Sequence, residues 1–137
     1  MKFERKKVLI VDDSAINRRI LADMLSAEYQ IIEARGGENA ILCLRSFGDE
    51  LALVLLDIFM PDVDGFAVLE EMNRQGWIEN IPVITISSDG SAENVDKAYE
   101  LGVADFISKP FDTLMVKQRV THTINNYRKP ERNWSFA

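Results

Sequence analysis

The stretch Lys7-Val-Leu-Ile-Val-Asp-Asp-Ser14 is a short apolar run that stops at two consecutive acidic residues. An uninterrupted apolar run of this length is typical of a strand buried on both faces. Ser14 can cap a following helix, because its hydroxyl can accept a free backbone N–H of the first turn. The residues after it predict a helix with an apolar stripe made of Ile16, Ile20, Leu21, Met24 and Leu25.

The same pattern recurs along the chain. Further short apolar runs lie at residues 29–32, 53–56, 82–86 and 105–108, and each is followed by a segment whose apolar residues have helical spacing. Strands that are apolar on both faces and alternate with amphipathic helices favour a parallel sheet covered on both sides. The sequence therefore predicts an α/β fold, a doubly wound five-stranded parallel sheet with helices on both faces. Residues 1–128 form the expected domain, and residues 129–137 a tail or the start of a linker.

Composition narrows the class of protein. The 137 residues are 47% hydrophobic and 28% charged, which excludes a disordered chain, and the net charge of −6 disfavours direct binding of nucleic acid. The single cysteine, Cys43, excludes an internal disulfide and a thiolate metal cluster. Apolar runs are too short to span a membrane, so we expect a cytoplasmic domain without membrane contact.

Polar residues follow the predicted strands. Asp12 and Asp13 follow the first, Asp57 the third, Ser87 the fourth, and Lys109 lies just after the fifth. In doubly wound sheets the binding site lies beyond the carboxyl ends of the strands, where the strand order reverses. One Asp after a strand is more often a helix cap or turn former, so it is the joint placement that indicates a site. Clustered carboxylates repel one another, and Mg²⁺ with oxygen ligands would relieve the repulsion.

Two other kinds of site do not fit. A dinucleotide site needs a glycine-rich turn after the first strand, whereas residues 11–17 contain no glycine and two negative charges. A calcium loop is suggested by Asp62-Val-Asp-Gly65, but Phe66 and Val68 occupy positions that would have to supply oxygen ligands.

Five segments, in this order, resemble the receiver domain of bacterial two-component response regulators of the chemotaxis-regulator type. They are Asp12-Asp13, Asp57-Ile-Phe-Met-Pro-Asp-Val-Asp-Gly65, Pro82-Val-Ile-Thr-Ile-Ser87, Gly102-Val-Ala-Asp-Phe106 and Lys109-Pro110-Phe111. The resemblance covers residues 7–127 and implies the (βα)5 flavodoxin-like receiver fold.

The resemblance also implies a chemistry. Asp57 would accept a phosphoryl group from a phosphohistidine on a sensor histidine kinase or a histidine phosphotransfer protein. Mg²⁺ would be held by Asp12, Asp13, Asp57 and the backbone carbonyl of Phe59, and Lys109 would contact a phosphoryl oxygen. The family also implies a cis peptide bond between Lys109 and the following proline.

The output implied by the resemblance is a conformational switch. Ser87 would donate a hydrogen bond to the phosphoryl group, and the ring of Phe106 would turn inward into the space that Ser87 vacates, altering the surface of the fourth helix, fifth strand and fifth helix. For Phe106 an ordinary core aromatic remains an equal alternative. Phe59 and Asp89, each two residues beyond a site residue, would modulate access of water to the phosphoryl group.

The implied partners are a kinase and a downstream target. A C-terminal effector domain of the cyclic-dinucleotide type is expected, with a free-standing regulator or phosphorelay shuttle as the alternative. A homodimer would use the switch surface. Arg18 and Arg19 form a solvated helix face or contact the kinase, and His122 is expected to be solvated. The switch would act as an enzyme only on itself, through phosphorylation and dephosphorylation at Asp57.

Two alternatives compete with a phosphoaccepting switch. A Mg²⁺-dependent phosphohydrolase of the haloacid-dehalogenase type needs an acid two residues after its aspartyl nucleophile. Phe59 stands there after Asp57, and Ser14 after Asp12, so that proton donor is missing. A degenerate receiver that serves only as an interaction module is disfavoured, because no ligand position has been lost.

Overall fold

Five parallel strands and five α-helices alternate along the residues that the computed structural model describes, 7–127. The strands are β1 (Lys7–Val11), β2 (Gln30–Ala34), β3 (Leu51–Asp57), β4 (Val83–Ser87) and β5 (Asp105–Ser108). The helices are α1 (Ala15–Leu25), α2 (Gly37–Phe47), α3 (Gly65–Gln75), α4 (Ala92–Glu100) and α5 (Thr113–Asn126), with short 3-10 turns at Gly48–Glu50 and Trp77–Glu79. The expected tail at residues 129–137 lies outside the described residues.

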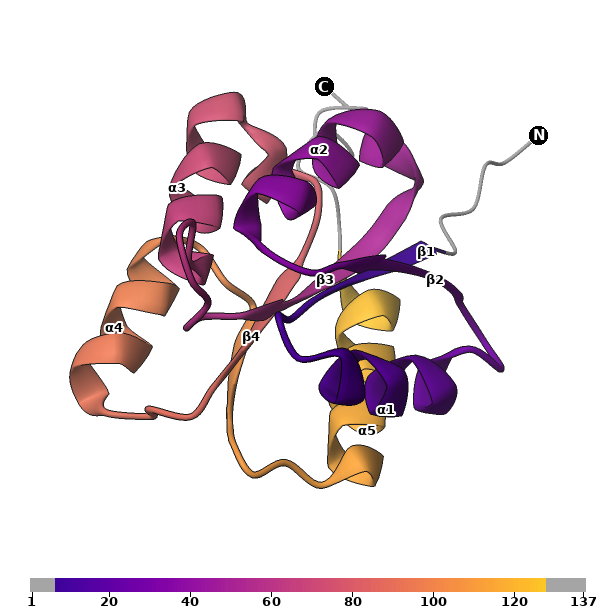
Figure 1. The fold of residues 1–137 in the computed structure, drawn as a ribbon. Coiled ribbons are helices and arrows are strands. Elements are labelled where there is room, and N and C mark those ends of the chain that lie inside the picture. Colours follow the sequence, from indigo (N-terminus) through magenta and orange to yellow (C-terminus); the bar gives the residue numbers. More distant parts are fainter. Residues whose placement is uncertain (1–6, 128–137) are drawn as a thin grey trace.

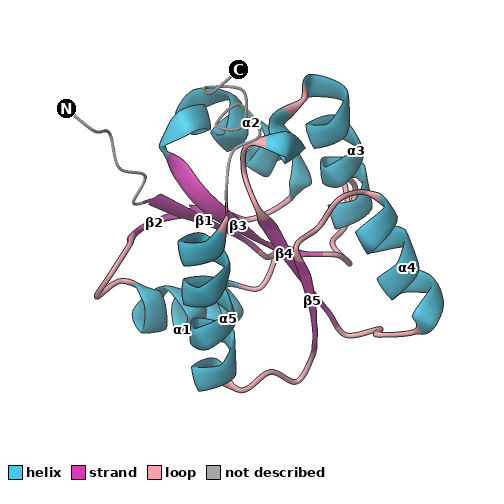
Figure 2. Ribbon diagram, turned by 180° about the vertical axis from the view of Figure 1, so that it is seen from behind, coloured by secondary structure: helices cyan, strands magenta, loops and turns pink. Residues whose placement is uncertain are grey.

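The sheet is doubly wound, as the sequence predicts. Its strand order is β2-β1-β3-β4-β5, and every pair is parallel. Helices α1 and α5 cover one face, while α2, α3 and α4 cover the other (Figures 1 and 2). All residues of β3 and β4 are buried, which is why these segments are nearly continuous in apolar residues.

The order of the strands reverses between β1 and β3. From β1 the chain proceeds to β2 on one side, and from β3 it proceeds to β4 and then β5 on the other. The connections that leave β1 and β3 therefore diverge, which opens a crevice at the carboxyl ends of these two strands. Asp12 follows β1 and Asp57 ends β3, so both lie at this point.

Helix α1 begins where the sequence predicts, but its buried face is narrower. Ser14 is the N-cap, and its hydroxyl accepts a hydrogen bond from the Asn17 N–H at 3.2 Å. Leu21 and Leu25 are buried against the sheet, but the other members of the predicted stripe are not equally covered. Ile16 and Ile20 are 74% and 40% exposed, and Met24 is partly buried. The predicted apolar stripe is therefore only partly buried, because the helix turns its Leu21 face toward the strands and leaves Ile16 and Ile20 in solvent.

The described part of the chain contains no helix that combines the length and apolarity needed to cross a membrane.

Candidate functional site

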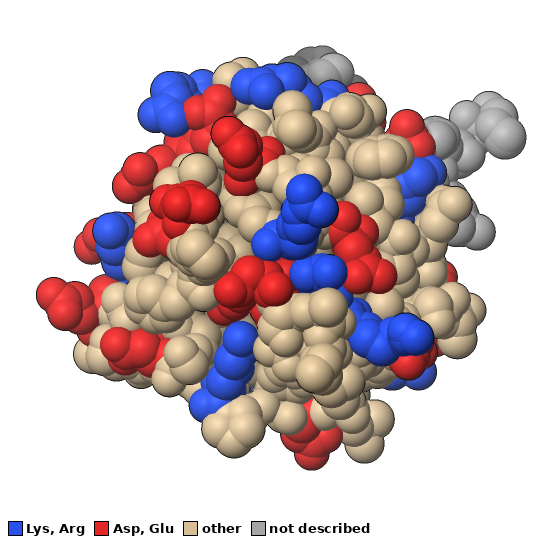
Figure 3. All heavy atoms as spheres, viewed as in Figure 1, with Lys and Arg blue, Asp and Glu red and all other residues tan. Residues whose placement is uncertain are grey.

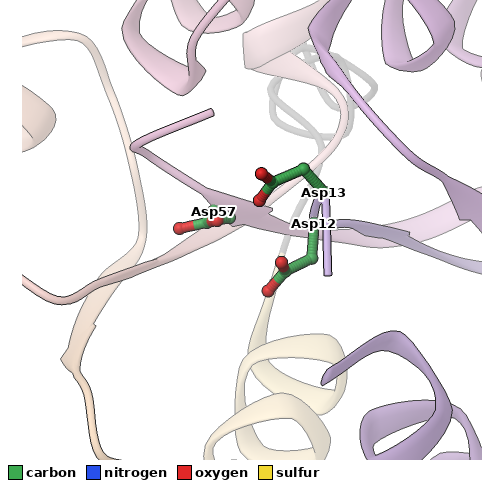
Figure 4. Close-up of side chains that lie close together, drawn as sticks. All are labelled: Asp12, Asp13 and Asp57. Carbon is green, nitrogen blue, oxygen red and sulfur yellow. The ribbon is translucent and has the colours of Figure 1, made fainter. Parts of the chain in front are cut away.

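Three carboxylates meet at the reversal of strand order. Ligand oxygens of Asp12, Asp13 and Asp57 all lie within 4.8 Å of one another. In Figure 4 Asp12 and Asp13 point to opposite sides of the chain that leaves β1, and Asp57 lies beside them at the end of β3. Asp12 and Asp57 are buried and Asp13 is exposed, so the cluster is open to solvent from one side.

Among residues 7–127, one lysine reaches this cluster, from beyond β5. The Lys109 Nζ lies 3.5 Å from Asp57 Oδ1 and 3.6 Å from Asp12 Oδ2. The Lys109–Pro110 peptide bond is cis, as the family resemblance implied. One ammonium against three carboxylates leaves an excess of negative charge at the site. That excess and the all-oxygen donor set fit a hard divalent cation such as Mg²⁺.

The pKa of Asp57 is raised from its ordinary value of 3.8 to about 6. Burial is the largest cause, because it disfavours the charged form, and the neighbouring carboxylate of Asp12 adds to the effect. The ammonium of Lys109 acts in the opposite direction and favours the carboxylate. A cation bound at the cluster would act in the same direction as Lys109 and favour the ionised form of Asp57.

The loop after β3 folds back onto the strand end that carries Asp57. The Gly65 N–H donates to the Ile58 carbonyl at 2.7 Å. A Cβ atom on Gly65 would lie 2.6 Å from the Asp57 carbonyl oxygen and 2.7 Å from the Ile58 Cα. Only glycine allows this close backbone approach, which holds Asp57 and the start of α3 together.

The hydroxyl of Ser87 is engaged by the loop that leads to α4. Ser87 is fully buried, and its Oγ donates to the Asp89 carbonyl at 3.2 Å and accepts from the Asp89 N–H at 3.1 Å. The Asp89 carboxylate accepts from the Ser91 N–H at 3.0 Å. Movement of the Ser87 hydroxyl toward the site would therefore break its bonds to this loop.

Phe106 lies beside the same loop. Its ring is partly buried, and its Cε1 lies 4.0 Å from the position that a Cβ on Gly90 would take. Gly90 follows Asp89, so the loop that bonds the Ser87 hydroxyl also runs close to Phe106. The two residues predicted to form a switch are thus linked through one segment.

Phe59 follows the end of β3, two residues beyond Asp57. Its ring is 44% exposed and packs edge-on against Phe66, with centroids 6.5 Å apart and an interplanar angle of 90°. The Phe66 ring has a second neighbour, the Lys97 ammonium of α4, which lies 4.4 Å from the ring centroid. The Phe59 side chain thus packs against α3.

The structure adds a residue whose role the sequence did not indicate. Arg18 was expected to be solvated or to contact the kinase, but its side chain makes two hydrogen bonds within the chain. Its Nη1 donates to the Asp12 carbonyl at 2.7 Å and its Nε to Glu33 Oε1 at 2.9 Å. No sequence pattern links Arg18 to Glu33, because that pair forms only when β2 lies beside β1. Arg19 and His122 are exposed, and for His122 this agrees with the expectation.

Acidic and basic side chains alternate over the face shown in Figure 3. On this face the two signs are interspersed, and no broad surface of one sign is visible.

Comparison with known proteins places the chain among signalling domains. The family described as "Response regulator receiver domain" matches residues 8–121. A probable cyclic di-GMP phosphodiesterase of Vibrio cholerae is 34% identical over 90% of this chain, which covers 28% of that protein. The response regulator PleD of Caulobacter vibrioides is 35% identical over 83% of this chain and 25% of its own length.

A solved structure agrees with these relatives. One chain of the CheX-CheY-BeF3-Mg²⁺ complex of Borrelia burgdorferi superimposes with a TM-score of 0.78 and 34% identity, over 86% of this chain and 88% of that one. The curated relatives are mostly longer, and this chain spans 12% to 53% of the length of those compared.

Proposed function

Because this chain belongs to the response regulator receiver domain family, whose members are phosphoacceptor switches of two-component signalling, we propose that Asp57 is its phosphoacceptor. The observation that carries the proposal is the position of Asp57. It is a buried carboxylate at the reversal of strand order, with Asp12 beside it and the Lys109 ammonium 3.5 Å away.

The proposed reaction is a transfer between two nucleophiles. A carboxylate oxygen of Asp57 attacks phosphorus, an O–P bond forms, and the P–N bond to the donor histidine breaks with its electron pair left on the imidazole. Little covalent chemistry is asked of the protein, so positioning and charge compensation supply the catalysis. Hydrolysis of the acyl phosphate by water returns Asp57 to its carboxylate form, and this self-directed cycle is the full extent of the proposed enzymatic activity.

Two positive charges would compensate the negative charge of the phosphoryl group: a metal ion held by the carboxylates, and the ammonium of Lys109. Asp12, Asp13 and Asp57, with the Phe59 carbonyl, would hold Mg²⁺. Bound there, Mg²⁺ would neutralise part of the charge that accumulates when a carboxylate meets a phosphoryl group. Lys109 would bind a phosphoryl oxygen as a point charge, for which its position between Asp57 and Asp12 is suited.

A direct experiment tests the acceptor. The chain is incubated with acetyl phosphate and Mg²⁺, and its intact mass is compared with that of Asp57→Asn and of a sample in EDTA. A gain of one phosphoryl group that is lost in both controls is the expected result. Equal labelling of Asp57→Asn, or no labelling where another receiver is labelled, would contradict the proposal and favour a degenerate interaction module.

The proposed output is a shift between two conformations. The Ser87 hydroxyl exchanges its bonds to the Asp89 backbone for one to the phosphoryl group, and the loop so released moves, which lets the ring of the nearby Phe106 turn inward. The surface of α4, β5 and α5 then changes, and a partner or a second copy of the chain that binds one form better reads the change.

Receiver domains pair with histidine kinases, and we propose that α1 contributes to the docking surface for the phosphoryl donor. Ile16 and Ile20 lie one turn apart and exposed on α1, directly after the loop that carries Asp12 and Asp13. Replacing Ile16 by Ser should slow transfer from a phosphorylated donor protein and leave labelling by acetyl phosphate unchanged. An equal loss with both donors would contradict a docking role.

For the complete protein we propose residues 1–128 as the receiver domain and an effector of the cyclic-dinucleotide class as its target. Support comes from two relatives, the probable cyclic di-GMP phosphodiesterase and a putative response regulator with a GGDEF domain whose receiver has a TM-score of 0.80. Phosphorylation of the full-length protein should then change its synthesis or hydrolysis of cyclic di-GMP. Unchanged turnover in a phosphorylated sample would contradict this output.

A further inference from the structure

Arg18 joins three segments that meet next to the carboxylate cluster. It lies near the start of α1, and its side chain is only 17% exposed. One prong of the guanidinium donates to the Asp12 carbonyl at 2.7 Å, and the Nε donates to Glu33 on β2 at 2.9 Å. The planar guanidinium suits this double contact, because its donors have a fixed relative geometry that the ammonium of a lysine lacks.

The carbonyl that Arg18 binds belongs to the peptide group between Asp12 and Asp13. Since a peptide group is planar, the orientation of this carbonyl sets the direction in which the chain enters Asp13. The other side of Asp12 is also held, because its N–H donates to the Ala34 carbonyl at 3.1 Å. With both contacts in place, the backbone that carries two of the three carboxylates has one orientation.

The Asp12 side chain is held by separate contacts. Its Oδ1 accepts from the Ser14 N–H at 2.9 Å, and its Oδ2 accepts from the side-chain Nδ2 of Asn17 at 3.4 Å. These bonds orient the carboxylate of Asp12. The bond from Arg18 instead holds the peptide group that leads to Asp13. The exposed Asp13 depends more on the backbone, because no hydrogen bond to its carboxylate contributes to the network described above.

Arg18 acts through geometry more than through its charge. Arg18 is itself paired with Glu33, which offsets its positive charge.

We propose that Arg18 is a positioning residue of the cation site, which holds the Asp12–Asp13 peptide so that both carboxylates face a bound divalent cation. The inference rests on the proposed function only in taking that cation to be Mg²⁺. Residues that orient metal ligands in this way commonly change metal affinity about 10- to 100-fold when they are removed.

The test is a Mg²⁺ titration without any phosphoryl donor, followed by the NMR amide shifts of Asp12, Asp13 and Asp57. Arg18→Ala should raise the dissociation constant about 10-fold or more. Glu33→Gln is the matched control, because it removes the ion pair but leaves the bond from Arg18 to the carbonyl, and it should bind Mg²⁺ like the wild type. Arg18→Lys keeps the charge and should bind Mg²⁺ between the wild type and Arg18→Ala.

Urea unfolding in EDTA separates positioning from general stability. A purely structural role would lower the free energy of unfolding of Arg18→Ala and leave the Mg²⁺ affinity of the folded fraction unchanged, which would overturn the proposal. Equal weakening of Mg²⁺ binding by Glu33→Gln and Arg18→Ala would overturn it as well, because the ion pair would then be responsible. If Arg18→Ala does not fold, Arg18→Lys decides the question by the same titration.

The outcome is independent of the acceptor assignment. A wild-type chain that binds Mg²⁺ but is not phosphorylated at Asp57 contradicts the proposed function, while the comparison of Arg18 variants still decides the role of Arg18. A wild-type chain that binds no Mg²⁺ overturns both.

Discussion

The Lys109 ammonium lies 3.5 Å from the Asp57 carboxylate, although Lys109 follows β5 and Asp57 ends β3, with β4 between them. The same ammonium lies 3.6 Å from Asp12 after β1. Lys109 thus bridges strand ends from both halves of the doubly wound sheet. It compensates part of the charge of the cluster and leaves the exposed Asp13 side open.

Replacing Lys109 with Met should remove the cation beside Asp57 and raise the pKa of that carboxyl further. Labelling by acetyl phosphate at neutral pH should slow about 100-fold, because a charged contact to the transferring group is lost. Intact mass against time measures the rate. Lys117→Met on α5 is the control and should be labelled at the wild-type rate. A Lys109→Met chain labelled as fast as this control would contradict the role of Lys109.

The raised pKa of Asp57 predicts a pH-dependent stability. The pKa of Asp57 in the folded chain, about 6, exceeds its ordinary value of 3.8, so protonation of this carboxyl stabilises the folded state. This stabilisation is fully present below pH 3.8 and is lost as the pH rises through 6. In EDTA, the unfolding free energy of the wild type minus that of Asp57→Asn should therefore rise by about 2 to 3 kcal/mol between pH 8 and pH 4. Urea unfolding measures it, and a difference independent of pH would refute the shift.

Adding a methyl group at Gly65 should disturb the acceptor loop. The Cβ of Gly65→Ala would overlap the Asp57 carbonyl oxygen, so we expect a loss of about 1 to 3 kcal/mol of stability and slower phosphorylation. The matched control is Gly36→Ala, because no atom lies within 4 Å of a Cβ at that position and its φ of −174° is open to any residue. Equal effects of the two substitutions in urea unfolding would show that the close approach at Gly65 is unimportant.

The switch hypothesis predicts that Phe106→Ala separates phosphorylation from output. Labelling of Asp57 should proceed normally, but the change in hydrogen exchange over α4 that phosphorylation causes in the wild type should be absent. Phe106→Leu retains most of the side-chain bulk and should preserve part of the change. A full exchange response in Phe106→Ala would instead identify Phe106 as an ordinary packing residue.

Phe59 should lengthen the life of the phosphoryl group. Phe59 lies two residues beyond Asp57, is 44% exposed and packs against Phe66, and we expect its bulk to limit the approach of water to the phosphoryl group. Phe59→Asn should therefore lose phosphate several-fold faster once acetyl phosphate is removed, as followed by intact mass. Ile20→Asn makes the same kind of change at a position of similar exposure on α1 and should decay like the wild type. A lifetime that is unaltered in Phe59→Asn would rule out a shielding role.

Asp89 is the second residue predicted to modulate access of water to the phosphoryl group. The rate of phosphate loss from Asp89→Ala, measured in the same way, tests its contribution.

Much of the site follows from residues that terminate strands. Asp12, Asp57 and Ser87 each stand at the end of an apolar run that is buried on both faces, and parallel strands place such ends on one edge of the sheet. The motifs around Asp57 and Lys109 made the same edge recognisable as that of a receiver domain. These features were predictable because they depend on local order along the chain.

Errors arose where several neighbouring residues had the same character. The apolar residues of α1 cover so much of the helix surface that more than one face could be buried. Only packing against the strands decided that Leu21 and Leu25 are buried while Ile16 and Ile20 are exposed. Arg18 and Arg19 look alike in the sequence, yet one is bonded to Asp12 and Glu33 and the other is exposed.

The sequence by itself determined the alternation of strands and helices, the helix cap at Ser14, and the acidic, hydroxyl and lysine residues at the strand ends, because these depend on hydrophobic period and on neighbours within one turn. Only the tertiary structure decided the strand order, the 3.5 Å approach of Lys109 to Asp57, the position of Phe106 close to the loop that bonds Ser87, and the bond from Arg18 to the Asp12 carbonyl. Each of these joins segments that are distant in the chain, so each depends on how the helices pack onto the sheet and not on any local preference.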